Sequence, residues 1–147
     1  MMLNKLPVGG SIEVVVDPRE FYVATGLQVD GGERYRIRGK GRWRDGARAP
    51  CDADGWRRWY ALPLRQWNRL GGVDFLRLCG AIGRSERYLL AGGREAIWNI
   101  PTEAGTLAPD ARELFLFAND WPNRYADNVV LQPQDGGPLR VMLTRSA

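Results

Sequence analysis

The chain has 147 residues, of which 44% are hydrophobic and 26% are charged, and its formal net charge is +4. These values are typical of one globular domain that buries its own core, so the sequence predicts a single domain over residues 1–147. The chain contains no histidine. This excludes the commonest general base, Ser–His and Cys–His nucleophile pairs and most zinc sites, and it favours a protein that is not an enzyme.

The clearest periodic signal follows two short predicted strands, at 12–16 and in ATGLQV, and the turn at 30–33. In RYRIRGKGRWR, residues 34–44, basic residues alternate with apolar or small ones. This period of two predicts one strand that buries Tyr35, Ile37 and Trp43. The other face would be cationic and would carry Arg34, Arg36, Arg38, Lys40, Arg42 and Arg44.

The cationic face has two interpretations. It is either solvated and neutralised by neighbouring acids such as Glu13, or it binds an anionic partner. The candidate partners are an anionic glycan, a membrane surface, a protein or a nucleic acid, with nucleic acid the least favoured.

Residues 45–75 form a basic and aromatic insertion. A short helix is predicted from Pro63 to Leu70, because proline suits a first helical position and Gly71-Gly72 suits an end. We expect residues 56–70 to lie outside the sheets and to pack some aromatics onto the domain or onto another subunit, which leaves a homo-oligomer open. We also expect that their deletion leaves a folded core.

Strands resume in RLCGAIG, RYLLAG, EAIWNI, RELFLFA and LRVMLTR. RELFLFA is apolar on both faces, which is typical of a central strand. Short strands with turns between them predict an all-β, antiparallel, jelly-roll-like sandwich. Cys51 and Cys79 lack CxxC spacing, and two free thiols are favoured over one disulfide. No apolar stretch has the length of a signal peptide or a transmembrane helix, and the compartment stays open.

A polar loop follows the central strand in FLFANDWPNRYADN, residues 115–128. Five of the ten residues from Asn119 to Asn128 are Asn or Asp. Such side chains offer the hard oxygens that Ca²⁺ prefers, and an incomplete shell would leave room for water or for sugar hydroxyls. The alternative is a turn whose Asx side chains cap their own backbone. An exposed Trp121 in this loop could stack on the apolar face of a sugar.

Four segments in this order resemble the calcium-dependent bacterial galactophilic lectins of the LecA type. They are TGLQVDGGERYRIRGKGRW, DADG, CGAIGRSERYLLAGG and LFLFANDWPNRYADN. The resemblance runs from about 12 to 145 and implies a β-sandwich that binds a sugar through calcium without catalysis.

The resemblance also implies roles for single residues. Asp120, Asp127 and Asn128 would be side-chain ligands of Ca²⁺, while Arg124 and Asp45, or a neighbour of Asp45, would give backbone carbonyls. In these lectins the ion also binds two sugar hydroxyls. The sugar site would include the following residues: Trp121, Asp120, Asp127, Asn128, Asp52 and Asp54.

The chain departs from the lectin pattern at three places. CDADG has neither His nor Gln, Trp121 replaces a smaller residue, and VVLQPQDGGPL precedes the last strand. Calcium is therefore better supported than galactose. The sugar could be galactose-like or another glycan.

Overall fold

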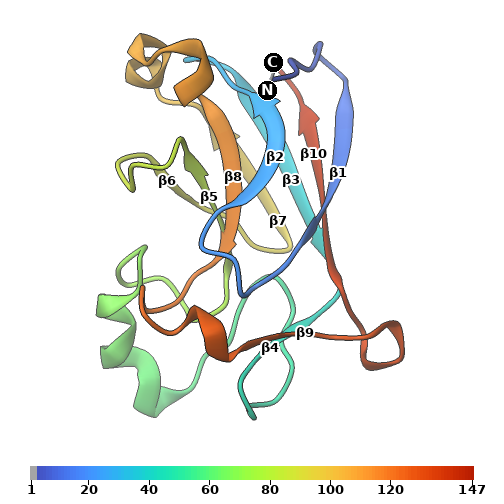
Figure 1. Cartoon of the computed structure of the whole chain (residues 1–147), viewed down its shortest axis with the longest axis vertical. Coiled ribbons are helices and arrows are strands. Elements are labelled where there is room, and N and C mark those ends of the chain that lie inside the picture. Colours follow the sequence, from blue (N-terminus) through green and yellow to red (C-terminus); the bar gives the residue numbers. More distant parts are fainter. Residues whose placement is uncertain (1–2) are drawn as a thin grey trace.

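The computed structural model describes residues 3–147 as two antiparallel four-stranded sheets (Figure 1). One sheet has the order β1 (Ser11–Val16), β10 (Leu139–Arg145), β3 (Arg34–Lys40) and β7 (Glu95–Asn99). The other has the order β2 (Val23–Gln28), β8 (Glu113–Ala118), β5 (Leu78–Ile82) and β6 (Leu89–Ala91). Side chains of both sheets meet in one apolar core, so the predicted all-β sandwich is confirmed.

Alternating residues of β3 and β10 fill one side of this core. Tyr35 and Ile37 are fully buried, as predicted, and the basic residues between them are exposed. All six residues of β8 are buried, and β8 lies between β2 and β5, as expected for a central strand. Cys51 and Cys79 are both free thiols.

The periodic stretch 34–44 is two strands instead of the predicted one. β3 ends at Lys40, and β4 (Trp43–Asp45) pairs with β9 (Asn128–Val130) in a separate small sheet. The break lies at Gly41, which has φ +99°, and a Cβ there would stand 2.4 Å from the carbonyl oxygen of Pro138. Only glycine fits that turn, so the chain leaves the first sheet. Trp43 is still buried, but Arg44 is only half exposed.

Residues 59–67 form the 3₁₀ helix η1 (Trp59–Trp67), which lies outside the sheets. It begins four residues before the predicted helix, and Pro63 is inside it and not at its start. Proline is tolerated in this short irregular helix, where one backbone donor is lost without breaking a long ladder. The remaining helices are short 3₁₀ turns that were not predicted: η2 (Thr102–Thr106), η3 (Pro109–Ala111), η4 (Tyr125–Asp127) and η5 (Pro133–Asp135). Within residues 3–147 no helix has the length and apolar character needed to cross a membrane.

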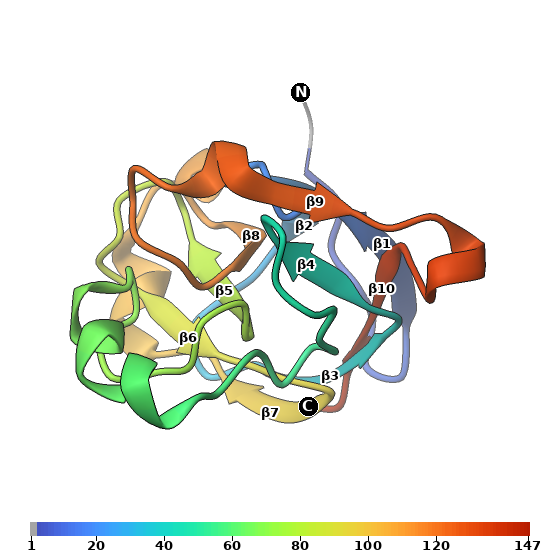
Figure 2. The ribbon, with the colours of Figure 1, turned by 90° about the horizontal axis from the view of Figure 1, so that it is seen from below.

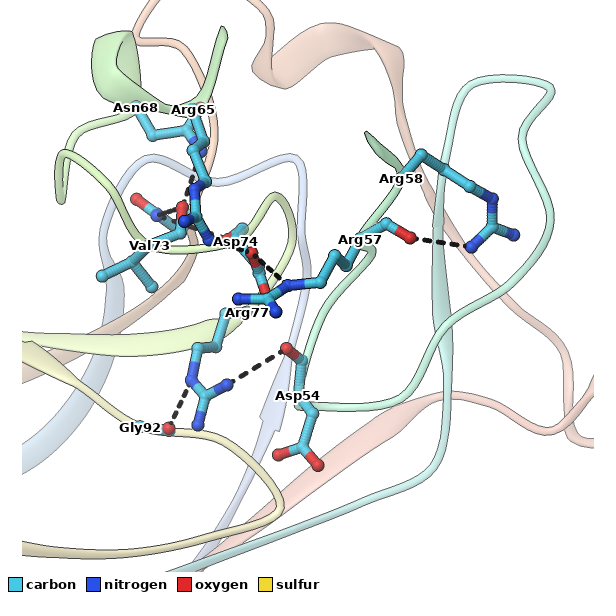
Figure 3. Close-up of polar contacts among 10 residues, drawn as sticks. Asp54, Arg57, Arg58, Arg65, Asn68, Val73, Asp74, Arg77 and Gly92 are labelled. Carbon is cyan, nitrogen blue, oxygen red and sulfur yellow. Dashed lines mark hydrogen bonds and ion pairs between the residues drawn. The ribbon is translucent and has the colours of Figure 1, made fainter. Parts of the chain in front are cut away.

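Polar side chains join parts of the insertion to one another and to the residues that flank β5 and β6 (Figure 3). Asp74 accepts hydrogen bonds from Arg57 and from Arg65, at 3.2 and 2.7 Å. Arg77 donates to the carbonyl oxygens of Gly92 and Asp54. Asp74 therefore joins two parts of the insertion, and Arg77, just before β5, joins the 51–55 loop of the insertion to the turn after β6.

Arg69 extends this attachment into the interior. Its side chain is 0% exposed, pairs with both carboxylate oxygens of Glu86 at 2.6 Å, and stacks over Phe21 and Phe117. A cation buried this way leaves its partners unpaired when it is removed. Whether residues 56–70 can be deleted stays a prediction, and Arg69 weighs against it.

Candidate functional site

Three of the predicted metal-binding residues meet at one end of the sandwich, seen face-on in Figure 2. Asp120 follows β8, Asn128 begins β9, and Asp45 ends β4. β4 and β9 pair with Asp45 directly opposite Asn128. The small sheet that the sequence did not predict is thus what brings the two chain segments together.

Asp120 and Asn128 each present a buried oxygen without a donor. Asp120 is 2% exposed; its Oδ1 accepts from the backbone N–H of Trp121 at 2.7 Å, but its Oδ2 has no partner among residues 3–147. Asn128 Nδ2 donates to the carbonyl of Pro18, and its Oδ1 is likewise without a partner. Leaving buried acceptors unpaired is costly, so each oxygen keeps the capacity to bind a water or a cation.

Burial also disfavours the ionised forms of the carboxyl groups of Asp120 and Asp45. Desolvation raises the pKa of Asp120 to about 6, and the nearby negative charge of Asp45 adds to the effect. Burial raises the pKa of Asp45 in the same direction. A bound cation would stabilise the ionised form of such a carboxylate.

Arg124 and Asp127 lie in the loop between Asp120 and Asn128, and both residues are exposed. The carbonyl of Arg124 accepts from the N–H of Asp127 at 3.3 Å, and that of Asp45 accepts from the N–H of Arg48 at 3.0 Å. A carbonyl oxygen has two lone pairs, so each keeps capacity for a ligand role. The Asp127 carboxylate is half exposed and accepts from Arg124 Nε at 3.1 Å, so it would have to leave this pair to reach an ion.

The described part of the chain, 3–147, holds no cluster of three or more His, Cys, Asp or Glu side chains placed for a metal. The residues here supply instead one buried carboxylate, one amide oxygen and backbone carbonyls. Calcium accepts such mixed oxygen ligands and irregular geometry, whereas zinc prefers nitrogen and sulfur. The donor set therefore fits calcium better than a transition metal.

A pocket of about 140 Å³ opens beside these oxygens. Its polar lining consists of Asp45, Arg48, Asp120 and Arg124. The rest of its wall is apolar and comes from Trp56, Tyr60, Ala61, Leu64, Phe75 and Trp121. The sequence predicted that some aromatics of 56–70 pack onto the domain or onto another subunit, but it did not show where, because the pocket needs η1 to pack against the loop that follows β8.

Trp121 is half-buried in this wall instead of standing free in solvent. Its Nε1 donates to the carbonyl of Leu64 at 3.1 Å, and its ring lies 6.1 Å from that of Phe75. The ring contributes one face to the pocket, which is compatible with its predicted contact to a ligand.

Asp52 and Asp54 lie elsewhere. Asp52 Oδ1 accepts from the N–H of Asp54, and Asp54 accepts from the backbone and side chain of Arg94, after β6. Neither residue lines the pocket. The structure does not bring them to Asp120, and their role in sugar binding stays a prediction.

Comparison with known proteins identifies one fold. No family model and no curated protein matches the sequence. Eight chains of known structure match, among them one described as "EclA N-terminal domain; PllA-like lectin". It superposes with a TM-score of 0.56 and 22% sequence identity over 92% of this chain and 94% of that chain. This chain has the fold of that lectin domain.

The match agrees with the resemblance in the sequence as far as the fold. It covers both sheets and the loops between them, since nearly all of each chain is included. Binding of calcium and of a sugar depends on the site residues of this chain.

Proposed function

We propose that this chain is a non-catalytic carbohydrate-binding domain that uses one calcium ion. The observation that carries the proposal is the pair of buried, unpartnered oxygens, Asp120 Oδ2 and Asn128 Oδ1; Asp120 is also part of the lining of an aromatic pocket. The fold shared with a lectin domain supports a sugar as the ligand.

The residues would have the following roles in calcium binding. Asp120 and Asn128 would hold the ion with side-chain oxygens, and Arg124 and Asp45 would add carbonyls. Asp127 would join after Arg124 releases it. A bound calcium would supply positive charge that attracts two vicinal sugar hydroxyls, and the carboxylates beside it would accept hydrogen bonds from those hydroxyls.

The sugar would contact the residues that line the pocket. A galactose-like ligand follows from the lectin resemblance only, and the loop with Asp52 and Asp54 lies away from the pocket. Trp121 is better placed, because its ring is part of the pocket wall and pyranose rings pack their C–H faces on aromatics. A homo-oligomer also stays a prediction.

A thermal melt tests the proposal. The wild-type chain should melt at a higher temperature in 1 mM CaCl₂ than in EDTA, and a panel of monosaccharides should add to the shift only when calcium is present. Asp120→Asn and Asp127→Ala should abolish the calcium shift. Asp135→Asn, in the exposed turn η5, is the matched control and should keep it. Equal melts of the wild type with calcium and with EDTA would contradict calcium binding.

The cationic face supports a second candidate, an interaction module for an anionic partner. Arg36 and Arg38 share one carboxylate, Glu95, and Lys40 makes no ion pair within residues 3–147. On the other edge Glu13 pairs with Arg140 of β10 and not with β3. The basic side chains of β3 are thus only partly neutralised.

Salt distinguishes the two candidates. Binding to heparin that weakens steeply with NaCl, does not require calcium, and falls in Arg38→Ala would favour the second. Calcium-dependent binding to a neutral glycan, unchanged in Arg38→Ala, would favour the first.

A further inference from the structure

A second groove, of about 720 Å³, lies on the face of the small sheet that points away from the proposed calcium site. Successive residues of a strand point to opposite faces, so Arg44 lies on the face opposite to that of Trp43 and Asp45. Asp45 lines the aromatic pocket, whereas Arg44 lines the groove. The groove also includes Pro50 and residues 129–136, whose turn η5 projects at the edge of the molecule in Figure 1.

The Arg44 side chain has no acceptor in the described part of the chain. Its Nε is buried without a hydrogen-bond partner, and no carboxylate of residues 3–147 pairs with its guanidinium. A buried donor without an acceptor is costly, and folded proteins seldom leave one unpaired. A guanidinium presents parallel N–H groups that match two oxygens of a carboxylate, phosphate or sulfate. The Arg44 guanidinium is thus available to an acceptor from outside the chain.

Arg42 lies two residues earlier, lines the same groove, and is held from two sides. Its Nη2 donates to the carbonyl of Pro50 at 3.2 Å. Its aliphatic part packs on the turn after η5, where a Cβ on Gly136 would stand 2.8 Å from Arg42 Cδ. An arginine has five N–H donors, so this single bond within residues 3–147 leaves most of them for a ligand. The groove therefore presents two guanidinium groups, one of them fixed in place.

The remaining lining restricts what the groove can bind. Asp135 is its one acidic residue and pairs with neither arginine, so the charge of the lining is positive. Gln132 and Gln134 add amide groups, which both donate and accept hydrogen bonds. A single inorganic ion would occupy little of this volume, which is in the range of sites for small molecules. The groove therefore suits an oxyanion carried on a larger polar molecule.

We propose that Arg42 and Arg44 bind the phosphate, sulfate or carboxylate group of an acidic sugar, and that the amides of Gln132 and Gln134 contact its hydroxyls. This site is separate from the calcium site and lies on the other face of the small sheet. The inference goes beyond the proposed function and does not depend on it, because no calcium is required.

Isothermal titration calorimetry in calcium-free buffer without a chelator tests the site. The probes are glucose 6-phosphate, glucose 6-sulfate and glucuronate, with glucose, inorganic phosphate and inorganic sulfate as controls. At least one acidic sugar should bind saturably and more tightly than every control. Arg44→Gln and Arg42→Gln should each weaken this binding about tenfold, since each removes a charge-assisted hydrogen bond. Asp135→Asn should tighten it, because the variant removes the negative charge of the lining.

Arg38→Gln is the matched control, with the same change of charge on the cationic face of β3, and should bind as the wild type does. Arg44→Gln should melt within about 2 °C of the wild type, because the side chain has no partner to lose. The absence of binding by all three acidic sugars would overturn the site. An equal loss in Arg38→Gln, or weaker binding in Asp135→Asn, would overturn it too. Equal affinities for glucose 6-phosphate and inorganic phosphate would overturn the sugar and leave an anion site alone.

Discussion

The body of the sandwich and its loop end are stabilised in different ways. In the body, strand ladders and alternating apolar side chains fix the structure, as in β3 and β10. At the loop end, single polar side chains bridge irregular segments; Asn119 alone accepts from the N–H of Leu70 and donates to the carbonyls of Leu70 and Val73. The loop end therefore depends on the bonds of a few polar residues, whereas the body distributes its stability over many residues.

Arg69→Met is expected to have the largest effect at the loop end. It removes a buried cation, leaves Glu86 with the Tyr22 hydroxyl but without its ion pair, leaves the carbonyl of Phe21 without this donor, and should lower the free energy of unfolding by about 3 kcal/mol. Urea denaturation measures the loss. Arg58→Met, at an exposed arginine of the same segment, should change stability by less than about 0.5 kcal/mol. A small effect of Arg69→Met would mean that the loop end, like the body, shares its stability widely.

Calcium should act almost entirely on the loop end. At a hundredfold excess over its dissociation constant, an ion that binds only the native state stabilises it by about 2.7 kcal/mol. Hydrogen exchange should slow at the backbone amides of Trp121, Arg124 and Asp127 before it changes in β10. Asn128→Ala should abolish this protection. Uniform protection of both regions would show instead that the loop end does not open independently.

Acid should strengthen the calcium-free loop end. The pKa of Asp120 is raised to about 6 in the folded chain, above the ordinary value of 3.8. The folded state therefore binds the proton more tightly, and stability increases as the pH falls through 6 towards 4. From pH 7 to pH 5 this contributes about 1 kcal/mol in EDTA, and Asp120→Asn should remove it. With calcium the sign reverses, because protons compete for the same carboxylate. The free energy of unfolding, measured at pH 7 and pH 5 with and without calcium, checks both the gain in EDTA and its reversal by calcium.

A substitution on the cationic face of the body should change the free energy of unfolding least. Glu95→Gln removes the carboxylate that Arg36 and Arg38 share, but all three side chains are about half exposed or more. Exposed ion pairs contribute little, so the free energy of unfolding should fall by no more than about 0.5 kcal/mol, and less at high salt. A loss above 1 kcal/mol would show that charge on this face limits the stability of the body.

The sequence predicted the body better than the loop end for a physical reason. Period-two alternation reports which face of a strand is buried, and it located Tyr35, Ile37 and the apolar β8 correctly. It did not show that Gly41 divides the stretch 34–44, because that break comes from the close approach of Pro138. Contacts between segments distant in the chain leave no local pattern.

The candidate site, too, depends on contacts between distant segments that the sequence did not show. The cluster of Asn and Asp marked the loop, and the structure brings Asp45, Asp120 and Asn128 together. The aromatic wall was not predicted, since it requires η1 and Trp121 to meet. Asp52 and Asp54 were placed near the sugar by resemblance alone, and their bonds to Arg94 hold them elsewhere.

The hydrogen bond from Trp121 to the carbonyl of Leu64 joins the loop with the proposed ion ligands to the helix that carries most of the apolar wall. The ion ligands and the apolar wall could therefore change independently during divergence. The proposed ion ligands lie on the loop after β8 and on the small sheet, but most of the apolar wall lies on η1. Because the bond uses a backbone carbonyl, the side chains of η1 can be exchanged without altering it. Homologues could thus acquire new ligand preferences through residues 60, 61 and 64 while the oxygens at 120 and 128 are retained.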